Sequence, residues 1–249
     1  MIAEMEIIKK ITNFSKYYKE KYLLIEKEDG FEECSKDDIE KFSFCGLQYF
    51  FHHSLYQGRN DKLSAEVDRR VNEVLRSSQF FKEKRLVLDD YDKGKEEKPE
   101  GLKEELKKKL KPNNNRNSKE NAGRENDIEH VLDVLRYIKY KTEENREYDY
   151  NIVKISIKYI KEGRIMEHYK ELIQKEKKDT SIKEMGPKVA SFYLRDVVSL
   201  FNLQQNIGKE DLDAIIPVDV WVERIMKKLS FVNDSELNGI SEEKKMQVI

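Results

Sequence analysis

Apolar side chains recur along the chain at steps of three and four residues, the spacing of one buried face of an α-helix. The pattern predicts a first helix around residues 7–18 and further helices over residues 37–56, 63–81, 128–141, 151–161 and 166–175. The segment 37–56 is apolar on more than one side, which is typical of a central helix. Strand signals are weak, and Arg85 to Leu88 is the only short candidate. We therefore predict an all-α fold.

One polar stretch, residues 92–126, interrupts this pattern. It holds 11 basic and 8 acidic residues, and its apolar side chains are almost confined to Leu102, Leu106 and Leu110. Such a composition predicts no core, and we expect a mobile insert with at most one marginal helix. A solvated loop is the simpler interpretation, and a DNA-contacting arm is the alternative.

Composition narrows the class of protein. Lys and Arg number 48 against 49 Asp and Glu, so the formal net charge of −1 does not indicate a strongly basic nucleic-acid binder. The 13 Tyr and 11 Phe argue against a disordered chain. No apolar run approaches the ~18 residues that span a bilayer, and acids stand where a secretory signal needs basic residues. We expect a cytoplasmic protein, nucleoid-associated if the source is prokaryotic, with no membrane partner.

Cysteine and histidine give no metal signal. Cys34 and Cys45 are too few for a disulfide framework or a four-thiolate cluster, and a single disulfide is not expected in a cytosolic chain. The adjacent His52 and His53 must point to different sides of a helix, which disfavours zinc. We predict no metal site, and ordinary helix-surface or core roles for the four histidines: His52, His53, His130 and His168.

The first segment with chemical potential runs from Ile182 to Arg195. Its pattern predicts a short helix that ends at residues 184–185, a turn through Gly186, and a new helix that begins with Pro187. Glycine permits the positive φ that a tight turn can need. Val189, Phe192 and Tyr193 are expected to form the apolar face of that helix. Backbone N–H groups at its N-terminus suit a phosphate oxygen. Lys188 lies in the first turn and is either a reactive amine or a surface phosphate contact.

The second segment runs from Ile215 to Ile225. Pro217 precedes Asp219, which stands directly before a predicted helix with an apolar face that includes Trp221. Taken alone, Asp219 is most simply an N-cap residue.

Together and in this order, Gly186-Pro-Lys-Val-Ala190 and Pro217-Val-Asp-Val220 resemble the helix–hairpin–helix DNA glycosylases, and most closely the 8-oxoguanine glycosylases. The resemblance covers about 45 residues, 182–225. It implies that Lys188 is the nucleophile that forms a Schiff base with deoxyribose. It also implies that Asp219 is the essential carboxylate.

The chain departs from the family pattern in three ways. Glu184 stands where the hairpin often has a first glycine, Lys188 and Asp219 are 31 positions apart, and no cysteine follows Asp219. The last departure excludes the iron–sulfur cluster of endonuclease III-like members. The resemblance implies no cofactor, although it allows a monovalent cation at the hairpin.

By the resemblance, the fold is a bundle of two helical lobes with a cleft between them. Residues 1–36 and 204–249 would form the terminal lobe. Residues 37–203 would form the central lobe, with the insert 92–126 and the helix–hairpin–helix at about 180–202.

DNA contacts are expected from two places. The hairpin would hold the DNA backbone through Lys183, Gly186, Pro187 and Arg195. The turn after the aromatic helix would fill the gap left by the extruded base, through Gln57, Arg59 and Asn60, although Gly58 could instead be only a helix C-cap. The base pocket is not located, since four candidate stacking residues are equally candidates for the core: Phe50, Phe51, Tyr193 and Trp221.

The sequence thus predicts a monomeric base-excision repair enzyme that removes an oxidised purine from damaged double-stranded DNA and then cleaves the strand. The alternatives are a monofunctional DNA glycosylase and a non-catalytic helix–hairpin–helix DNA-binding protein. An all-α interaction protein with a chance match is the third.

Overall fold

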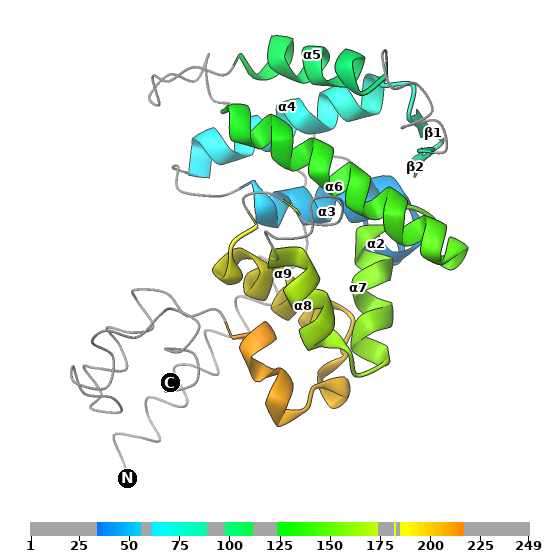
Figure 1. The fold of residues 1–249 in the computed structure, drawn as a ribbon, viewed down its shortest axis with the longest axis vertical. Helices are drawn as coiled ribbons and strands as arrows, with labels where there is room; N and C mark the ends of the chain where they lie inside the picture. Colours follow the sequence, from blue (N-terminus) through cyan, green and yellow to red (C-terminus); the bar gives the residue numbers. More distant parts are fainter. Residues whose placement is uncertain are drawn as a thin grey trace, which may run out of the picture.

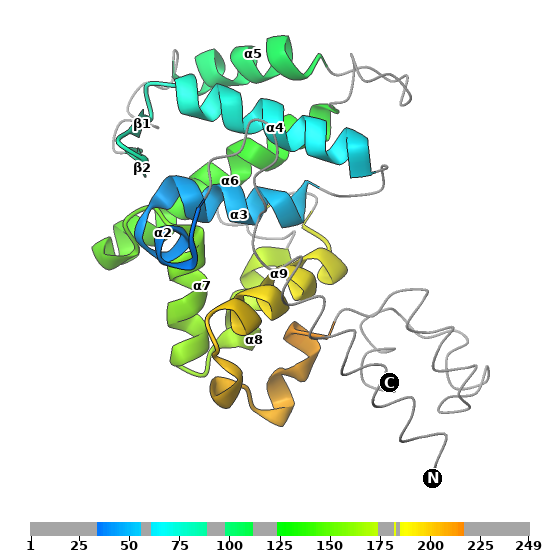
Figure 2. The ribbon, with the colours of Figure 1, turned by 180° about the vertical axis from the view of Figure 1, so that it is seen from behind.

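The computed structural model describes residues 34–55, 61–88, 98–111, 124–173, 182 and 185–216. This part of the chain is mostly helical, as predicted, and its buried apolar side chains form a single core. Figures 1 and 2 show α4, α5 and α6 on one side of α3, and α7, α8 and α9 on the other. The two-lobed division stays a prediction, because most of the expected terminal lobe lies outside the described residues.

Helix α3 (Ser43–Ser54) is the central helix that the pattern predicted. It packs against α2 (Lys36–Lys41), α4 (Asp61–Ser77), α7 (Ile152–Lys161) and α9 (Pro187–Leu200). Its apolar side chains on several sides are almost fully buried: Phe44, Cys45, Leu47, Phe50 and Phe51. Helix α3 is therefore covered on several sides and helps to position α2, α4, α7 and α9.

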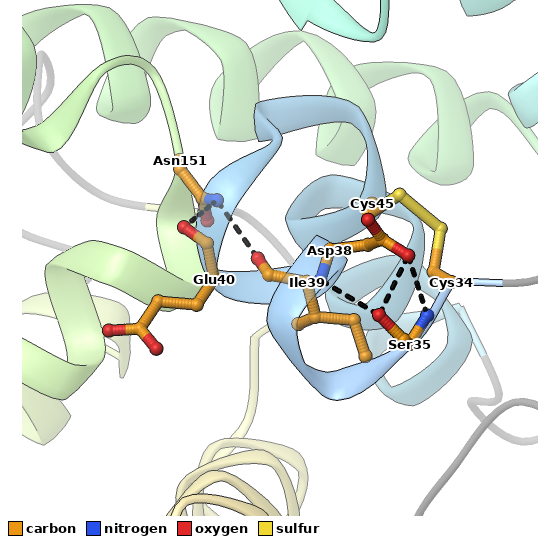
Figure 3. The surroundings of a disulfide bond; sticks show 7 residues. All are labelled: Cys34, Ser35, Asp38, Ile39, Glu40, Cys45 and Asn151. Carbon is orange, nitrogen blue, oxygen red and sulfur yellow. Dashed lines mark hydrogen bonds between the residues drawn. A yellow bond between two sulfur atoms is a disulfide. The ribbon is translucent and has the colours of Figure 1, made fainter.

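The single helix predicted over residues 37–56 is two helices, α2 and α3, which break at Phe42. The break is stabilised from a distant part of the chain. The side-chain amide of Asn151 donates hydrogen bonds of 2.9 and 3.1 Å to the carbonyls of Ile39 and Glu40 at the end of α2 (Figure 3). A Cβ on Gly46 would clash with that amide, so glycine is required there.

The expectation of unpaired cysteines is wrong. Cys34 and Cys45 form a disulfide, with their Cα atoms 5.9 Å apart, and it joins the residue before the N-cap of α2 to the first turn of α3 (Figure 3). Both cysteines are buried. Their spacing of 11 residues gave no signal, since it is the turn between α2 and α3 that brings the two sulfur atoms together.

The expectation that the polar insert has no core is also wrong in part. Residues Lys98–Leu110 form helix α5, and Leu102, Leu106 and Leu110 are buried where α5 packs against α4 and α6 (Glu125–Glu144). Leucines four residues apart lie on one helix face, and three of them suffice when two other helices cover that face. Ion pairs from Lys103 to Glu129 and from Lys109 to Glu73 flank the contact.

The remaining helices lie where the periodicity placed them, with ends shifted by at most four residues. They are α4, α6, α7 and α8 (Ile165–Ile173), and Asn151 caps α7 by accepting hydrogen bonds from the N–H groups of Val153 and Lys154. The short strand signal corresponds to β2 (Arg85–Leu86), which pairs antiparallel with β1 (Phe81–Lys82). Short 3-10 helices η2 (Arg146–Tyr148), η3 (Gln204–Asn206) and η4 (Lys209–Ala214) complete the described fold. The helix predicted at residues 7–18 lies outside it.

Candidate functional site

Helix α9 begins as the sequence predicted. Gly186 is its N-cap, Pro187 is its first residue, and the N–H groups of Val189 and Ala190 both donate to the Gly186 carbonyl at 3.1 Å. The side chain of Lys188 in the first turn is exposed. The amine is therefore presented to solvent at the positive end of a 14-residue helix.

Gly186 does not use the positive φ that glycine permits. Its φ is −79° and its ψ is 162°, a conformation open to any residue, and no atom lies within 4 Å of where a Cβ would stand. Neither backbone strain nor packing within the described residues requires glycine here.

The first helix of the expected hairpin is not confirmed. Ile182 and Met185 are buried but belong to no helix, and the Met185 N–H donates to the Ile182 carbonyl at 3.3 Å, closing a single turn. The last helix described before this turn is α8, which ends at Ile173. Lys183 and Glu184 lie outside the described residues.

The exposed face of α9 combines two cations with an aromatic ring. The Lys188 Nζ lies 5.7 Å from the centroid of the Phe192 ring, and the Arg195 guanidinium carbon lies 4.7 Å from it. These residues are spaced i, i+4 and i+7, so they follow one side of the helix. We call them the α9 face; it is basic and aromatic, a pairing typical of nucleic-acid contacts.

Phe192 was expected in the apolar face, and this is wrong: its side chain is half-buried and lies close to both cations. The opposite side of α9 is the buried one, formed by Ala190, Tyr193, Leu194 and Val197. The spacing of Lys188, Phe192 and Arg195 was the available signal, since residues four and three apart share a side.

Behind Arg195, a chain of polar contacts crosses from α9 to α3. The Arg195 Nε donates to the Asp196 Oδ1 at 2.7 Å, and the Asp196 Oδ2 lies 3.1 Å from the Nε2 of His53. The other ring nitrogen, Nδ1, lies 2.8 Å from the carbonyl oxygen of Tyr49. Burial raises the pKa of Asp196, but the contacts with His53 and Arg195 outweigh it and lower the pKa overall. Asp196 is therefore a buried carboxylate held between two partners.

His52 and His53 point to different sides of α3, as predicted. His52 faces the buried carboxylate of Asp68 on α4 with an Nδ1–Oδ2 distance of 3.6 Å, while His53 faces α9. Burial raises the pKa of Asp68. The two histidines thus connect the C-terminal end of α3 to two different helices.

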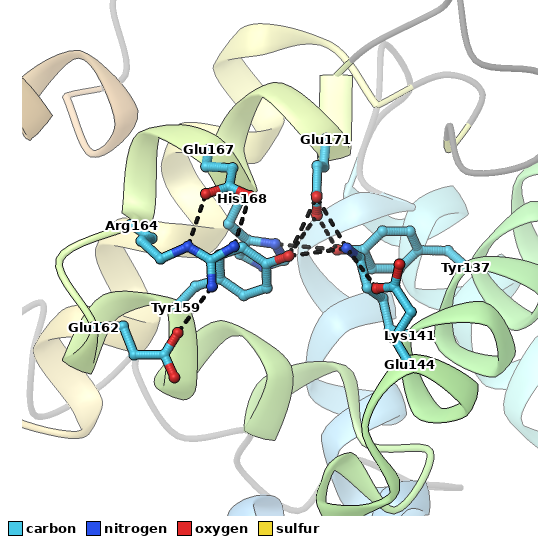
Figure 4. A network of polar contacts seen from close by, with 9 residues as sticks. All are labelled: Tyr137, Lys141, Glu144, Tyr159, Glu162, Arg164, Glu167, His168 and Glu171. Atoms are coloured by element: carbon cyan, nitrogen blue, oxygen red, sulfur yellow. Dashed lines mark hydrogen bonds and ion pairs between the residues drawn. The ribbon is translucent and has the colours of Figure 1, made fainter.

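A second buried network supports α9, and Figure 4 shows the part of it that lies on α6, α7 and α8. The hydroxyl of Ser156 lies 2.8 Å from both the Tyr193 hydroxyl and the His168 Nε2, and the His168 Nδ1 lies 3.1 Å from the Tyr137 hydroxyl. Burial, and then the charge of Lys141, lower the pKa of His168 to about 3. The ring is neutral, so this network is a structural tie between α6, α7, α8 and α9.

The charged residues of that network, Lys141 and Glu171, lie at its edge. The Lys141 amine donates to the Tyr159 hydroxyl and to the Glu171 carboxylate, both at 2.9 Å. Burial disfavours the ammonium, but these two partners outweigh burial and raise the pKa of Lys141. Lys141 therefore stays charged and cannot act as a neutral nucleophile at neutral pH.

The structure brings Gly186, Pro187, Lys188 and Arg195 together at α9. The other predicted site residues lie outside the described residues: Gln57, Arg59, Asn60, Lys183 and Asp219. Of the candidate stacking residues, Phe50, Phe51 and Tyr193 are fully buried core residues, and Trp221 is not described.

Helix α3 ends at Ser54 with Leu55 as its C-cap, and Gly58, the C-cap candidate of the sequence, lies outside the described residues. Sequence reasoning also missed Asp196 and the role of His53. No local pattern relates two residues 143 positions apart.

Within the described residues, no group of three or more His, Cys, Asp or Glu side chains is arranged to hold a metal ion. No described helix is long and apolar enough to cross a membrane. No family model, curated protein or solved structure matches the chain.

Proposed function

We propose that this protein is a DNA glycosylase with strand-cleaving lyase activity, acting on an oxidised purine of the 8-oxoguanine type in duplex DNA. The observation that carries the proposal is the position of Lys188. Its exposed amine stands in the first turn of α9, directly after Gly186 and Pro187 and beside the Phe192 ring. The order of residues is the one on which the family resemblance rests.

The proposed chemistry begins with the neutral amine of Lys188. Its Nζ forms a bond to C1′ of the deoxyribose while the bond from C1′ to the base nitrogen breaks, and the base leaves with the electron pair and takes up a proton. The C1′–O4′ bond of the sugar then opens as a proton moves from Nζ to O4′, which gives the Schiff base. The Schiff base permits loss of a C2′ proton and elimination of the 3′ phosphate.

Asp219 is proposed to stabilise the positive charge that develops on the sugar. A unit charge pair at 4 Å in a medium of effective dielectric 20 is worth about 4 kcal/mol, or about three orders of magnitude in rate. The described chain ends at Ile216, three positions before Asp219, after η4 has packed against α8 and α9.

The α9 face supplies the remaining contacts in this proposal. The open helix N-terminus at Gly186 suits a phosphate, and the partly exposed Phe192 ring suits an extruded base one helical turn from the amine. Stacking of a base on an aromatic side chain is worth about 1–3 kcal/mol, which offsets part of the cost of unstacking it.

Borohydride reduction on a duplex that bears 8-oxoguanine tests the proposal. We expect a covalent protein–DNA adduct from the wild-type chain and none from Lys188→Gln. Lys158→Gln is the matched control, because Lys158 lies on α7 and pairs with Glu147. An undiminished adduct in Lys188→Gln would remove Lys188 from the mechanism.

Assays of base release, strand cleavage and duplex affinity with the same variants separate the alternatives. Base release that persists in Lys188→Gln without strand cleavage identifies a monofunctional glycosylase. Equal affinity for damaged and undamaged duplexes, with no base release and no effect of Asp219→Asn, identifies a non-catalytic DNA-binding protein. In the proposed enzyme, Asp219→Asn lowers the rate of base release by about three orders of magnitude.

A further inference from the structure

Two elements that are far apart in sequence meet beside the candidate site, and His53 is the residue that joins them. It lies in the last turn of α3, and its side chain is 9% exposed. Both ring nitrogens face oxygen atoms: Nδ1 faces the Tyr49 carbonyl at 2.8 Å, and Nε2 faces the Asp196 carboxylate at 3.1 Å. A ring held at both nitrogens has a fixed orientation, so Asp196 meets a fixed partner.

The second step is the carboxylate of Asp196. One of its oxygens contacts His53 and the other accepts the hydrogen bond from the Arg195 Nε. Asp196 is nearly fully buried and therefore has little freedom to move. Its position on α9 next to Arg195 fixes the plane of the guanidinium.

The orientation of the Arg195 guanidinium determines how it can bind a phosphate. The guanidinium lies over the Phe192 ring, on the side of α9 that also presents Lys188. Guanidinium groups bind phosphate through a planar fork of N–H donors, and this recognition depends on the plane in which the fork is held. An adjacent Asp with no other partner could bind the guanidinium through both of its oxygens and so compete with phosphate. In Asp196, His53 contacts one of the two oxygens, and Arg195 contacts the other.

We propose that His53 is a positioning residue. Through Asp196, it holds the Arg195 guanidinium in the plane that binds a DNA phosphate next to the base extruded onto Phe192. This inference rests on the proposed function. It assigns Arg195 the phosphate contact and His53 the task of aligning it. It also ties the end of α3, from which residues 56–60 continue, to the helix that carries Lys188.

The experiment compares two replacements of His53 that differ in reach. The amide of Gln corresponds to the Nε2 position and can still donate to Asp196, whereas the shorter amide of Asn corresponds to Nδ1 and cannot. Single-turnover cleavage of an 8-oxoguanine duplex, measured over a range of enzyme concentrations, separates the half-saturating concentration from the maximal rate. We expect His53→Asn to raise the half-saturating concentration about ten-fold, the effect of one lost charge-assisted hydrogen bond, with the maximal rate within about two-fold. His53→Gln stays near the wild type.

Arg195→Gln supplies the second arm. It should raise the half-saturating concentration by the same factor, and the double variant with His53→Asn should be no worse than either single variant, since both remove one contact. The slope of log affinity against log salt should fall by about 0.9 in each. Arg136→Gln is the matched control, because Arg136 is a half-exposed arginine paired with Asp133 on α6. Thermal unfolding confirms that each variant is folded.

The outcomes separate the two proposals. A wild-type chain that neither releases the base nor forms an adduct overturns the proposed function and this inference with it. An active wild type overturns this inference alone if the losses from His53→Asn and Arg195→Gln multiply, if the maximal rate falls instead of the affinity, or if His53→Gln is as weak as His53→Asn.

Discussion

At the scale of single residues, the partly buried His53 and the fully buried His168 have different surroundings. His53 lies between a carbonyl and a carboxylate, and so faces acceptors on both sides. His168 is fully buried among hydroxyl groups, and burial lowers its pKa to about 3. Residue type alone could not distinguish these environments, since each depends on side chains contributed by other helices.

The buried His168 makes the stability of the protein depend on pH. Its ring takes up a proton near pH 6.5 in the unfolded chain but only near pH 3 in the folded one, so acid favours unfolding. The contribution of His168 is fully present above about pH 6.5 and is lost progressively as the pH falls towards 3. Between pH 7.5 and pH 5 we expect a loss of about 2 kcal/mol from this residue.

Urea unfolding at these two pH values provides the measurement. His168→Gln should show a smaller difference between pH 7.5 and pH 5 than the wild type by that amount, whatever its absolute stability. An identical pH difference in the two proteins would show that His168 is not buried as a neutral ring.

At the scale of elements, periodicity located the helices but not the surfaces that cover them. The pattern correctly indicated helices at α4, α6, α7 and α8 and a helix start at Pro187. It missed the break at Phe42, which Asn151 stabilises from 111 and 112 positions away. It predicted at most one marginal helix where α5 forms, because the three leucines of α5 make only a narrow apolar stripe.

Helix α5 gives the element-scale prediction. Leu106 is fully buried where α5 packs against α4 and α6, so Leu106→Ala should lower the free energy of unfolding by about 2–5 kcal/mol. Lys108→Ala is the control: this exposed residue lies on the same helix and should change stability by less than about 0.5 kcal/mol. Denaturant titration measures both, and a Leu106→Ala variant as stable as the control would show that α5 is not packed in the core.

At the scale of the whole molecule, the described helices hold α9 from three directions. Helices α3, α7 and α8 pack on it, and the network through Ser156 and His168 connects it to α6. The α9 face points away from these helices. In the proposed function, this support keeps the backbone of Lys188 in place while its side chain stays exposed, which suits a nucleophile.

The disulfide gives the prediction at this scale. A bridge between Cys34 and Cys45 closes a loop of about a dozen residues, which by chain entropy stabilises the fold by about 3 kcal/mol. Reductant should therefore lower the urea midpoint of the wild type, but not that of the double variant Cys34→Ser with Cys45→Ser. Two titratable thiols in the unreduced, denatured chain would show that the bridge does not form.

The sequence by itself determined what depends on neighbouring residues. It determined the helical character, the start of α9 at Pro187, and the position of Lys188 in the first turn, because hydrogen bonds within a helix join residues four apart. Only the tertiary structure decided which helix faces are covered. The burial of Leu106, the exposure of Phe192, the bridge from Cys34 to Cys45 and the contact between His53 and Asp196 all depend on how distant segments pack. The hydrophobic effect that drives this packing is non-directional, so a sequence pattern shows that a face will be buried without showing what will bury it.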